Sequence, residues 1–176
     1  MDLQDICFRS IEVIKETGNY IAGELGKFDT SRVETKGLHD FVSFVDKNSE
    51  KELVEAFSEI IPGSGFIVEE NTVNETDAEV KWIIDPLDGT TNFIHGLAPF
   101  AISVGLMVQK ELVMGVVYEI TRNECFYSWK GAKAFLDGKE IGVSKASNVK
   151  NSLIATGFPY YNYHRLPQFM NSLDFF

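Results

Sequence analysis

The chain has 176 residues, of which 44% are hydrophobic and 12% aromatic, and its 16 Lys and Arg against 26 Asp and Glu give a net charge of −10. This length and apolar content suffice for one domain with a buried core, and they exclude a disordered or collagen-like chain. The basic residues are scattered rather than gathered into a stripe, so we expect no unaided binding to nucleic acid.

Other features exclude a membrane protein and a disulfide-rich protein. No apolar run approaches the roughly 20 residues of a membrane span, and the N-terminus lacks the basic and apolar regions of a signal peptide. The only two cysteines, Cys7 and Cys125, lie far apart in the sequence. We expect two buried thiols, with neither a disulfide nor a zinc site. These features predict a cytoplasmic protein without membrane contact.

The first part of the chain carries the pattern of two helices. Apolar or small residues recur at steps of three and four over 3–25, which is the stripe of an amphipathic helix. A second helix is predicted over 46–60, with Asp46 as its N-cap, and Pro-Gly at 62–63 ends it. We expect the polar stretch 30–44 to be connecting chain or a short hairpin.

Short apolar runs bounded by turns follow, as is typical of buried strands. Two such runs are 65–68 and 81–85, and alternation over 101–108, followed by the runs 112–120 and 124–129, predicts an antiparallel meander. Helices followed by strands, without regular βαβα alternation, predict an α+β fold. We expect a layered α/β sandwich with an N-terminal helix pair packed on a mainly antiparallel sheet.

The C-terminal residues form an apolar stripe at helical spacing over 166–176, with Pro167 suited to a first turn. The stripe runs to the last residue without a capping signal. Exposed apolar surface of this kind is expected to have a partner, so we interpret the chain as a fragment of a longer protein.

The segment 69–88 is strongly acidic, with seven carboxylates and one lysine, Lys81. The three carboxylates in its middle are expected to be solvated, as charge runs usually are. Glu69, Asp85 and Asp88 instead follow apolar strand-like runs, where an unpaired carboxylate is costly to desolvate. With oxygen ligands alone, the hard cation Mg²⁺ is the favoured partner.

The segment WIIDPLDGTTNFIH at 82–95 indicates how such a site forms. Asp85 ends a strand, and we expect a tight turn at 86–89 to bring Asp88 back toward it and to aim the Leu87 carbonyl at the same ion. The letters GTTN that follow are typical of a helix start, whose N–H groups suit a phosphate. From this pattern alone, a plain Asp-Gly turn with Thr capping is an equal alternative.

The longer stretch WIIDPLDGTTNFIHG at 82–96 closely resembles the signature of the inositol monophosphatase family of Mg²⁺-dependent, lithium-sensitive phosphatases. The Glu-Glu pair at 69–70 resembles the metal element of that family, 36–46 resembles its Lys…Asp-x-Val-(Ser/Thr)-x-x-Asp segment, and 115–139 resembles its central sheet. Family members are longer and carry a Trp-Asp motif in a second half. We therefore expect residues 1–176 to be the N-terminal helix-plus-sheet domain of such a protein, with the C-terminal α/β domain largely absent.

The resemblance implies a role for each residue that matches the family pattern. The expected metal ligands, for two or more Mg²⁺ ions or for Mn²⁺, are Glu69, Asp85, the Leu87 carbonyl and Asp88. The expected catalytic groups are Asp46 and Thr90, as the dyad that deprotonates the attacking water. Glu70 is expected to support the water or a further metal ion. The expected ligands of the substrate phosphate are Gly89, Thr90 and Lys36, although Lys36 is equally suited to pair with a carboxylate.

The resemblance implies Mg²⁺-dependent hydrolysis of a small phosphomonoester, with inositol monophosphate as the first expected substrate, by a homodimer. Phosphatases of nucleotide 3′-phosphates or sugar phosphates are alternatives, because the groups that select the alcohol lie largely in the second half of the family. A non-catalytic interaction protein with the same fold is the alternative from a different class.

Overall fold

The structure is a computed structural model. It describes residues 1–25, 34–35, 41–42, 44–159 and 163–175. The chain divides into two compact units, Met1–Gly142 and Val143–Phe176. None of the helices in the described ranges is both long and apolar enough to cross a membrane.

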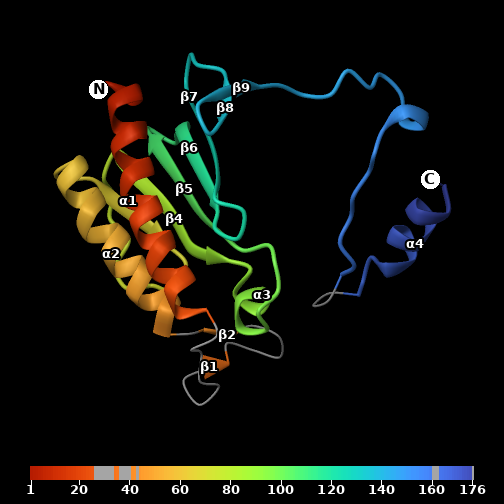
Figure 1. Cartoon of the computed structure of the whole chain (residues 1–176), viewed down its shortest axis with the longest axis horizontal. Coiled ribbons are helices and arrows are strands. Elements are labelled where there is room, and N and C mark those ends of the chain that lie inside the picture. The colour runs from red at the N-terminus through yellow and green to blue at the C-terminus, as the bar shows by residue number, and fades with distance from the viewer. Residues whose placement is uncertain (26–33, 36–40, 43, 160–162, 176) are drawn as a thin grey trace. The chain divides into compact units, whose positions relative to one another are not determined.

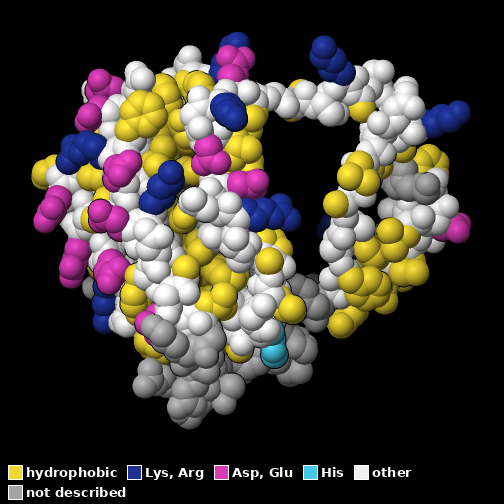
Figure 2. All heavy atoms as spheres, viewed as in Figure 1, with side chains coloured by type: hydrophobic (Ala, Val, Ile, Leu, Met, Phe, Trp, Pro, Cys, Tyr) yellow, Lys and Arg dark blue, Asp and Glu magenta, His cyan; other side chains and the backbone are white. Residues whose placement is uncertain are grey.

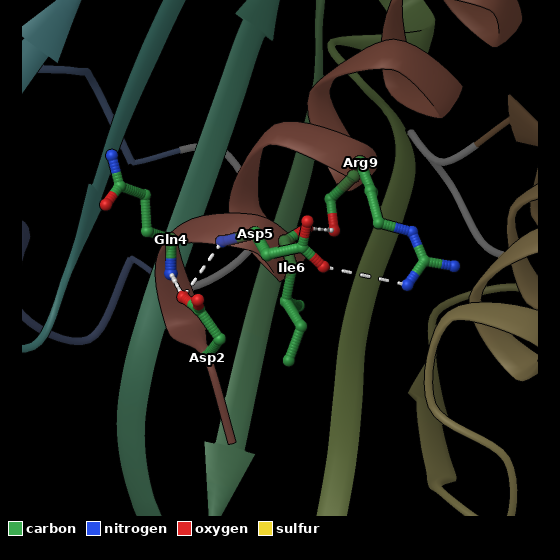
Figure 3. A network of polar contacts seen from close by, with 6 residues as sticks. Asp2, Gln4, Asp5, Ile6 and Arg9 are labelled. Atoms are coloured by element: carbon green, nitrogen blue, oxygen red, sulfur yellow. Dashed lines mark hydrogen bonds and ion pairs between the residues drawn. The ribbon is translucent and has the colours of Figure 1, made fainter.

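Helix α1 (Leu3–Glu24) covers the predicted amphipathic stripe, and Asp2 is its N-cap. The Asp2 carboxylate accepts hydrogen bonds from the backbone N–H groups of Gln4 and Asp5, at 3.1 and 3.2 Å (Figure 3). The Asp5 carboxylate also pairs with Arg9 one turn later, at 3.8 Å. The cap therefore satisfies two of the N–H groups that a helix start leaves without a partner.

Helix α2 (Phe44–Ile60) begins two residues earlier than predicted, so Asp46 lies inside its first turn. The prediction that Asp46 is the N-cap is therefore wrong. The earlier start follows from Val45, which is fully buried and extends the apolar stripe toward the N-terminus. The Phe57 ring stacks on Trp82 of the sheet, with the ring centroids 4.4 Å apart.

Seven strands form one sheet in chain order, from β3 to β9. They are β3 (Gly65–Val68), β4 (Val80–Asp88), β5 (Ala101–Val108), β6 (Glu111–Glu119), β7 (Glu124–Trp129), β8 (Ala134–Leu136) and β9 (Lys139–Ile141). Strands β3 and β4 are parallel, and each later neighbour is antiparallel. Strands β1 (Glu34–Thr35) and β2 (Phe41–Val42) form a separate antiparallel pair, which is the short hairpin that was one of the two expectations for 30–44.

The helices α1 and α2 lie side by side against one face of the sheet, which confirms the predicted α+β architecture (Figure 1). The alternation of β5 explains why the helices cover one face. Ile102, Val104 and Leu106 are buried in the core, while the residues between them are only half-buried. The opposite side of the sheet has a hollow of about 520 Å³ with a mostly apolar lining that includes Gly105, Gly115 and Phe126.

The surface over α1 and α2 carries acidic and basic side chains in a mixed arrangement rather than sorted by sign (Figure 2). This face has no basic stripe of the kind that follows a nucleic-acid backbone.

The second unit contains a short 3-10 helix, η2 (Val149–Asn151), and helix α4 (Leu166–Phe175). Pro167 lies in the first turn of α4, as the sequence predicts, because a first-turn residue needs no N–H partner. Phe169 of this helix makes an edge-to-face contact with Phe158, with centroids 5.5 Å apart.

Candidate metal and phosphate site

The segment that bears the candidate ligands is a bulged end of β4. Asp85 lies opposite Ser103 and Asp88 lies opposite Ala101, so three steps along β4 match two steps along β5. This is a β-bulge, and the strand continues to Asp88, so the prediction of a tight turn at 86–89 is wrong. The reason is packing, because Pro86 and Leu87 are buried and keep the chain in the sheet.

The parallel pairing of β3 and β4 brings Glu69 to Asp85. Val68, the last residue of β3, is the register partner of Ile84, and Glu69 and Asp85 are the next residues along the chain. Glu69 leaves β3 at the point where its parallel neighbour β4 reaches Asp85, so the two carboxyl groups lie close together. They share a side-chain hydrogen bond, so the structure brings these two candidate ligands together.

The electrostatics of this edge are unfavourable for negative charge. The pKa of Asp85 is raised to about 7, mainly by burial and also by the neighbouring Glu69 and Asp88, although the Leu87 N–H acts in the opposite direction. This N–H donates to the Asp85 carboxylate at 3.2 Å. Lys81, the one lysine of the acidic segment, pairs with Glu75 at 2.8 Å instead. The edge therefore accumulates carboxylates and favours a proton or a cation.

The donor set fits a hard divalent cation by its chemistry. Glu69, Asp85 and Asp88 offer carboxylate oxygens, and the Leu87 carbonyl accepts the Thr90 hydroxyl at 3.0 Å, which leaves it one further lone pair. Within the described ranges, no three His, Cys, Asp or Glu side chains are grouped closely enough to bind one metal ion. The structure thus joins Glu69 to Asp85 and leaves Asp88 exposed at the strand end.

The helix α3 (Thr90–Ile94) follows the bulge directly, as the GTTN pattern predicts. Gly89 is its N-cap and has φ 93°, a left-handed conformation that favours glycine. The Asn92 side chain donates to the Pro99 carbonyl at 2.8 Å and so holds α3 to the chain that leads into β5.

The other expected site residues are only partly brought to this edge. Asp46 is 2% exposed in the first turn of α2, and Glu70 is half-buried next to Glu69. The Thr90 hydroxyl donates to the Leu87 carbonyl, and the pairing of Asp46 with Thr90 stays a prediction. Lys36 lies outside the described residues.

Sequence reasoning missed Glu50 of α2, which is fully buried. A glutamate in a polar helix is normally assigned to the solvent side. The available signal was its position, since Glu50 falls on the same helical stripe as Leu53 and Phe57.

Residues 2–175 match the sequence model of the inositol monophosphatase family. The chain belongs to this family. The resemblance inferred from the signature at 82–96 is thereby confirmed.

Relatives and solved structures of this family agree with that assignment. The chain is 38% identical over 168 residues to the Nus factor SuhB of Haemophilus influenzae, which covers 93% of this chain and 63% of the relative. It resembles the crystal structure of the extragenic suppressor protein SuhB of Bartonella henselae, with TM-score 0.86, 32% identity, and coverage of 94% of this chain and 66% of the other. It also resembles an IMPase of Thermotoga maritima, with TM-score 0.73, 32% identity, and coverage of 82% and 55%. The chain thus spans less than two thirds of the length of each.

Proposed function

We propose that this chain supplies the metal and phosphate site of a Mg²⁺-dependent phosphatase that hydrolyses small phosphomonoesters, with inositol monophosphate as the first substrate to test. One observation supports this most directly: the parallel pairing of β3 with β4 brings Glu69, the residue after β3, to Asp85 of β4, and their carboxyl groups share a hydrogen bond. Membership in the inositol monophosphatase family supports the same chemistry.

The proposed metal ligands are Glu69, Asp85, the Leu87 carbonyl and Asp88. When bound, Mg²⁺ supplies positive charge that stabilises the phosphate oxygens and the leaving alcohol oxygen. The proposal includes two ions, with Mn²⁺ as a substitute, because Mg²⁺ keeps several water ligands and needs only one or two protein carboxylates.

We propose that side chains of this chain accept one proton from the attacking water and bind the substrate phosphate. A water oxygen forms a bond to phosphorus while the bond between phosphorus and the alcohol oxygen breaks. The dyad of Asp46 and Thr90 takes the proton of the water, and Glu70 supports the water's orientation. The leaving oxygen takes up one proton from solvent, so the products are the free alcohol and inorganic phosphate.

The phosphate would be held at the start of α3. The first N–H groups of a helix have no partner within the helix, and Gly89 and Thr90 carry those groups here. Lys36 is proposed as a further phosphate ligand.

Phosphate release from inositol 1-phosphate tests this proposal, with a nucleotide 3′-phosphate and a sugar phosphate as alternative substrates. Turnover should require Mg²⁺, should be inhibited by Li⁺, and should be lost in Asp88→Asn. The matched control is Asp77→Asn, which removes an exposed carboxylate from the loop before β4. Absence of Mg²⁺-dependent turnover with every substrate would contradict the proposal for this chain.

A second candidate is a role as a Nus factor, because several relatives bear that name, including those of Haemophilus influenzae and Escherichia coli. The Escherichia coli relative is 37% identical over 152 residues, which is 57% of its length. Complementation of a strain that lacks its own relative distinguishes the two candidates. Rescue by wild type and by Asp85→Asn alike would favour the interaction role, whereas rescue by wild type alone would favour catalysis.

A further inference from the structure

The buried carboxylate of Glu50 connects helix α2 to the segment that carries the candidate metal ligand Glu69. Both carboxylate oxygens are used. One accepts the backbone N–H of Glu70 at 2.6 Å. The other accepts the backbone N–H of Thr72 at 2.9 Å and the Thr72 hydroxyl at 2.7 Å.

These bonds are made to a part of the chain that has no regular secondary structure. Residues 69–79 connect β3 to β4 without helix or strand. Local contacts alone hold the first turn of this loop weakly: Asn71 has φ 55°, and its exposed side chain donates to the Glu69 carbonyl at 3.1 Å. Glu50 supplies the bonds that come from outside the loop.

The burial of Glu50 is costly, which makes a role in stability alone a poor explanation. A carboxylate that is fully removed from solvent loses its hydration, and hydrogen bonds only partly replace it. Glu50 lies on the stripe of Leu53 and Phe57, where an apolar side chain would bury surface without that cost. A carboxylate at this position does what an apolar residue cannot, since it accepts from N–H groups that precede and follow Asn71.

We propose that Glu50 is a positioning residue, which holds the turn at 69–72 on α2 so that the Glu69 carboxylate meets that of Asp85. This inference rests on the proposed function, because it assigns Glu50 to the metal site of that function. Glu50 touches neither metal nor substrate in this role and acts through Glu69. Residues that orient metal ligands in this way commonly change metal affinity by about 10- to 100-fold when replaced.

The test is a titration of the 176-residue chain with Mn²⁺, followed by electron paramagnetic resonance of the free ion, on wild type and Glu50→Gln. Gln keeps the volume of Glu but places an amide NH₂ against the N–H of Glu70 or Thr72. We expect Glu50→Gln to weaken Mn²⁺ binding by about 10-fold or more. The control is Glu55→Gln, which makes the same charge change at an exposed position of the same helix. This variant should bind Mn²⁺ with the wild-type affinity.

Hydrogen exchange of the loop is measured on the same samples. The amide of Glu70 or that of Thr72 should exchange faster in Glu50→Gln than in wild type, because Gln keeps only one of the two acceptor oxygens. If Glu50→Gln does not fold, Thr72→Val replaces it as the test variant, since it removes one of the three bonds without changing the helix. Thr72→Val should weaken Mn²⁺ binding by a smaller factor.

Two results would overturn the inference, and they differ in what they imply. Mn²⁺ binding by the wild type that neither Glu50→Gln nor Thr72→Val weakens would overturn the positioning role and leave the proposed function standing. No Mn²⁺ binding by the wild type would overturn the proposed function and the inference together.

Discussion

The carboxyl groups of Asp85 and Glu69 share a hydrogen bond at the point where β3 ends beside its parallel neighbour β4. The pKa of Asp85 is raised from 3.8 to about 7, mainly by burial and then by the charge of Glu69. The folded chain therefore keeps a proton at a pH where the unfolded chain has released it. The edge favours a proton, and we propose that it favours Mg²⁺ for the same reason.

The raised pKa of Asp85 predicts a specific pH dependence of stability. In the absence of metal, the free energy of unfolding should fall as pH rises from about 4 to about 7, because only the unfolded state releases the proton of Asp85 in that window. Asp85→Asn should remove this part of the slope and raise the melting temperature near pH 8 by a few degrees, since it eliminates a buried charge. Thermal unfolding followed by circular dichroism measures both effects.

The control for this experiment is Asp77→Asn, which removes a carboxylate from an exposed part of the same acidic segment and should keep the wild-type slope. Addition of Mg²⁺ should raise the melting temperature of wild type and of Asp77→Asn but not of Asp85→Asn. A slope that is unchanged in Asp85→Asn would show that this carboxyl group does not titrate as the structure implies.

The crossing of α1 over β6 depends on a glycine. A Cβ atom on Gly18 would overlap the ring of Tyr118, which is 4% exposed and whose hydroxyl donates to Asn123 at 2.8 Å. Because the ring is held at both ends, Gly18→Ala should lower the free energy of unfolding by about 1–3 kcal/mol. Urea denaturation measures the loss.

The matched control for Gly18→Ala is Gly23→Ala on the same helix, where a Cβ atom has nothing within 4 Å. Alanine is the better helix former by up to about 1 kcal/mol, so this variant should be neutral or slightly more stable. Equal destabilisation of the two variants would contradict the close approach of α1 to Tyr118.

The two thiols are predicted to be unreactive in the folded protein. Cys7 and Cys125 are both free and buried, and burial raises their pKa values to about 12 and about 11. Since the thiolate is the nucleophile, a disulfide reagent should label the native chain slowly and the urea-unfolded chain fast and completely. The raised pKa values also predict that the free energy of unfolding falls as pH rises above about 9, because only the unfolded thiols ionise there.

The single variants Cys7→Ala and Cys125→Ala serve as controls, because each leaves one thiol for labelling after unfolding. Rapid labelling of the native wild-type chain would show that one of the thiols is accessible, and the single variants would identify which.

Gly89 combines a left-handed backbone with close packing. It has φ +93°, and a Cβ atom there would lie 3.1 Å from the Pro99 carbonyl oxygen and 3.3 Å from Phe100. Gly89→Ala should therefore lower the free energy of unfolding by more than the roughly 1–2 kcal/mol expected from the left-handed backbone alone. It should also weaken Mn²⁺ binding, because it disturbs the end of the bulge that carries Asp88.

Gly96→Ala is the control for Gly89→Ala. Gly96 also has a positive φ, +65°, but no atoms lie within 4 Å of its Cβ position. In urea denaturation, Gly96→Ala should lose only the stability expected from the left-handed backbone. Its Mn²⁺ affinity should be unchanged. If the two variants behave alike in both measurements, crowding at Gly89 is not the cause.

Local patterns in the sequence were sufficient to predict most of the secondary structure. The stripe over 3–25 predicted α1 to within one residue, and the alternation over 101–108 predicted β5, because each pattern depends only on neighbours along the chain. The signature at 82–96 predicted the family, since a specific stretch of that length does not require a tertiary structure to be identified.

The tertiary structure decided which of the acidic residues meet. Glu69 and Asp85 are brought together by the register of β3 against β4, and no pattern within either strand contains that register. The bulge replaced the expected turn at 86–89 because Pro86 and Leu87 pack into the core, and the burial of Glu50 follows from the loop at 70–72 that covers it. The sequence by itself determined most of the elements and the kinds of ligand. The pairing of strands and the packing of α2 determined where these ligands lie, because both depend on contacts between residues far apart in the chain.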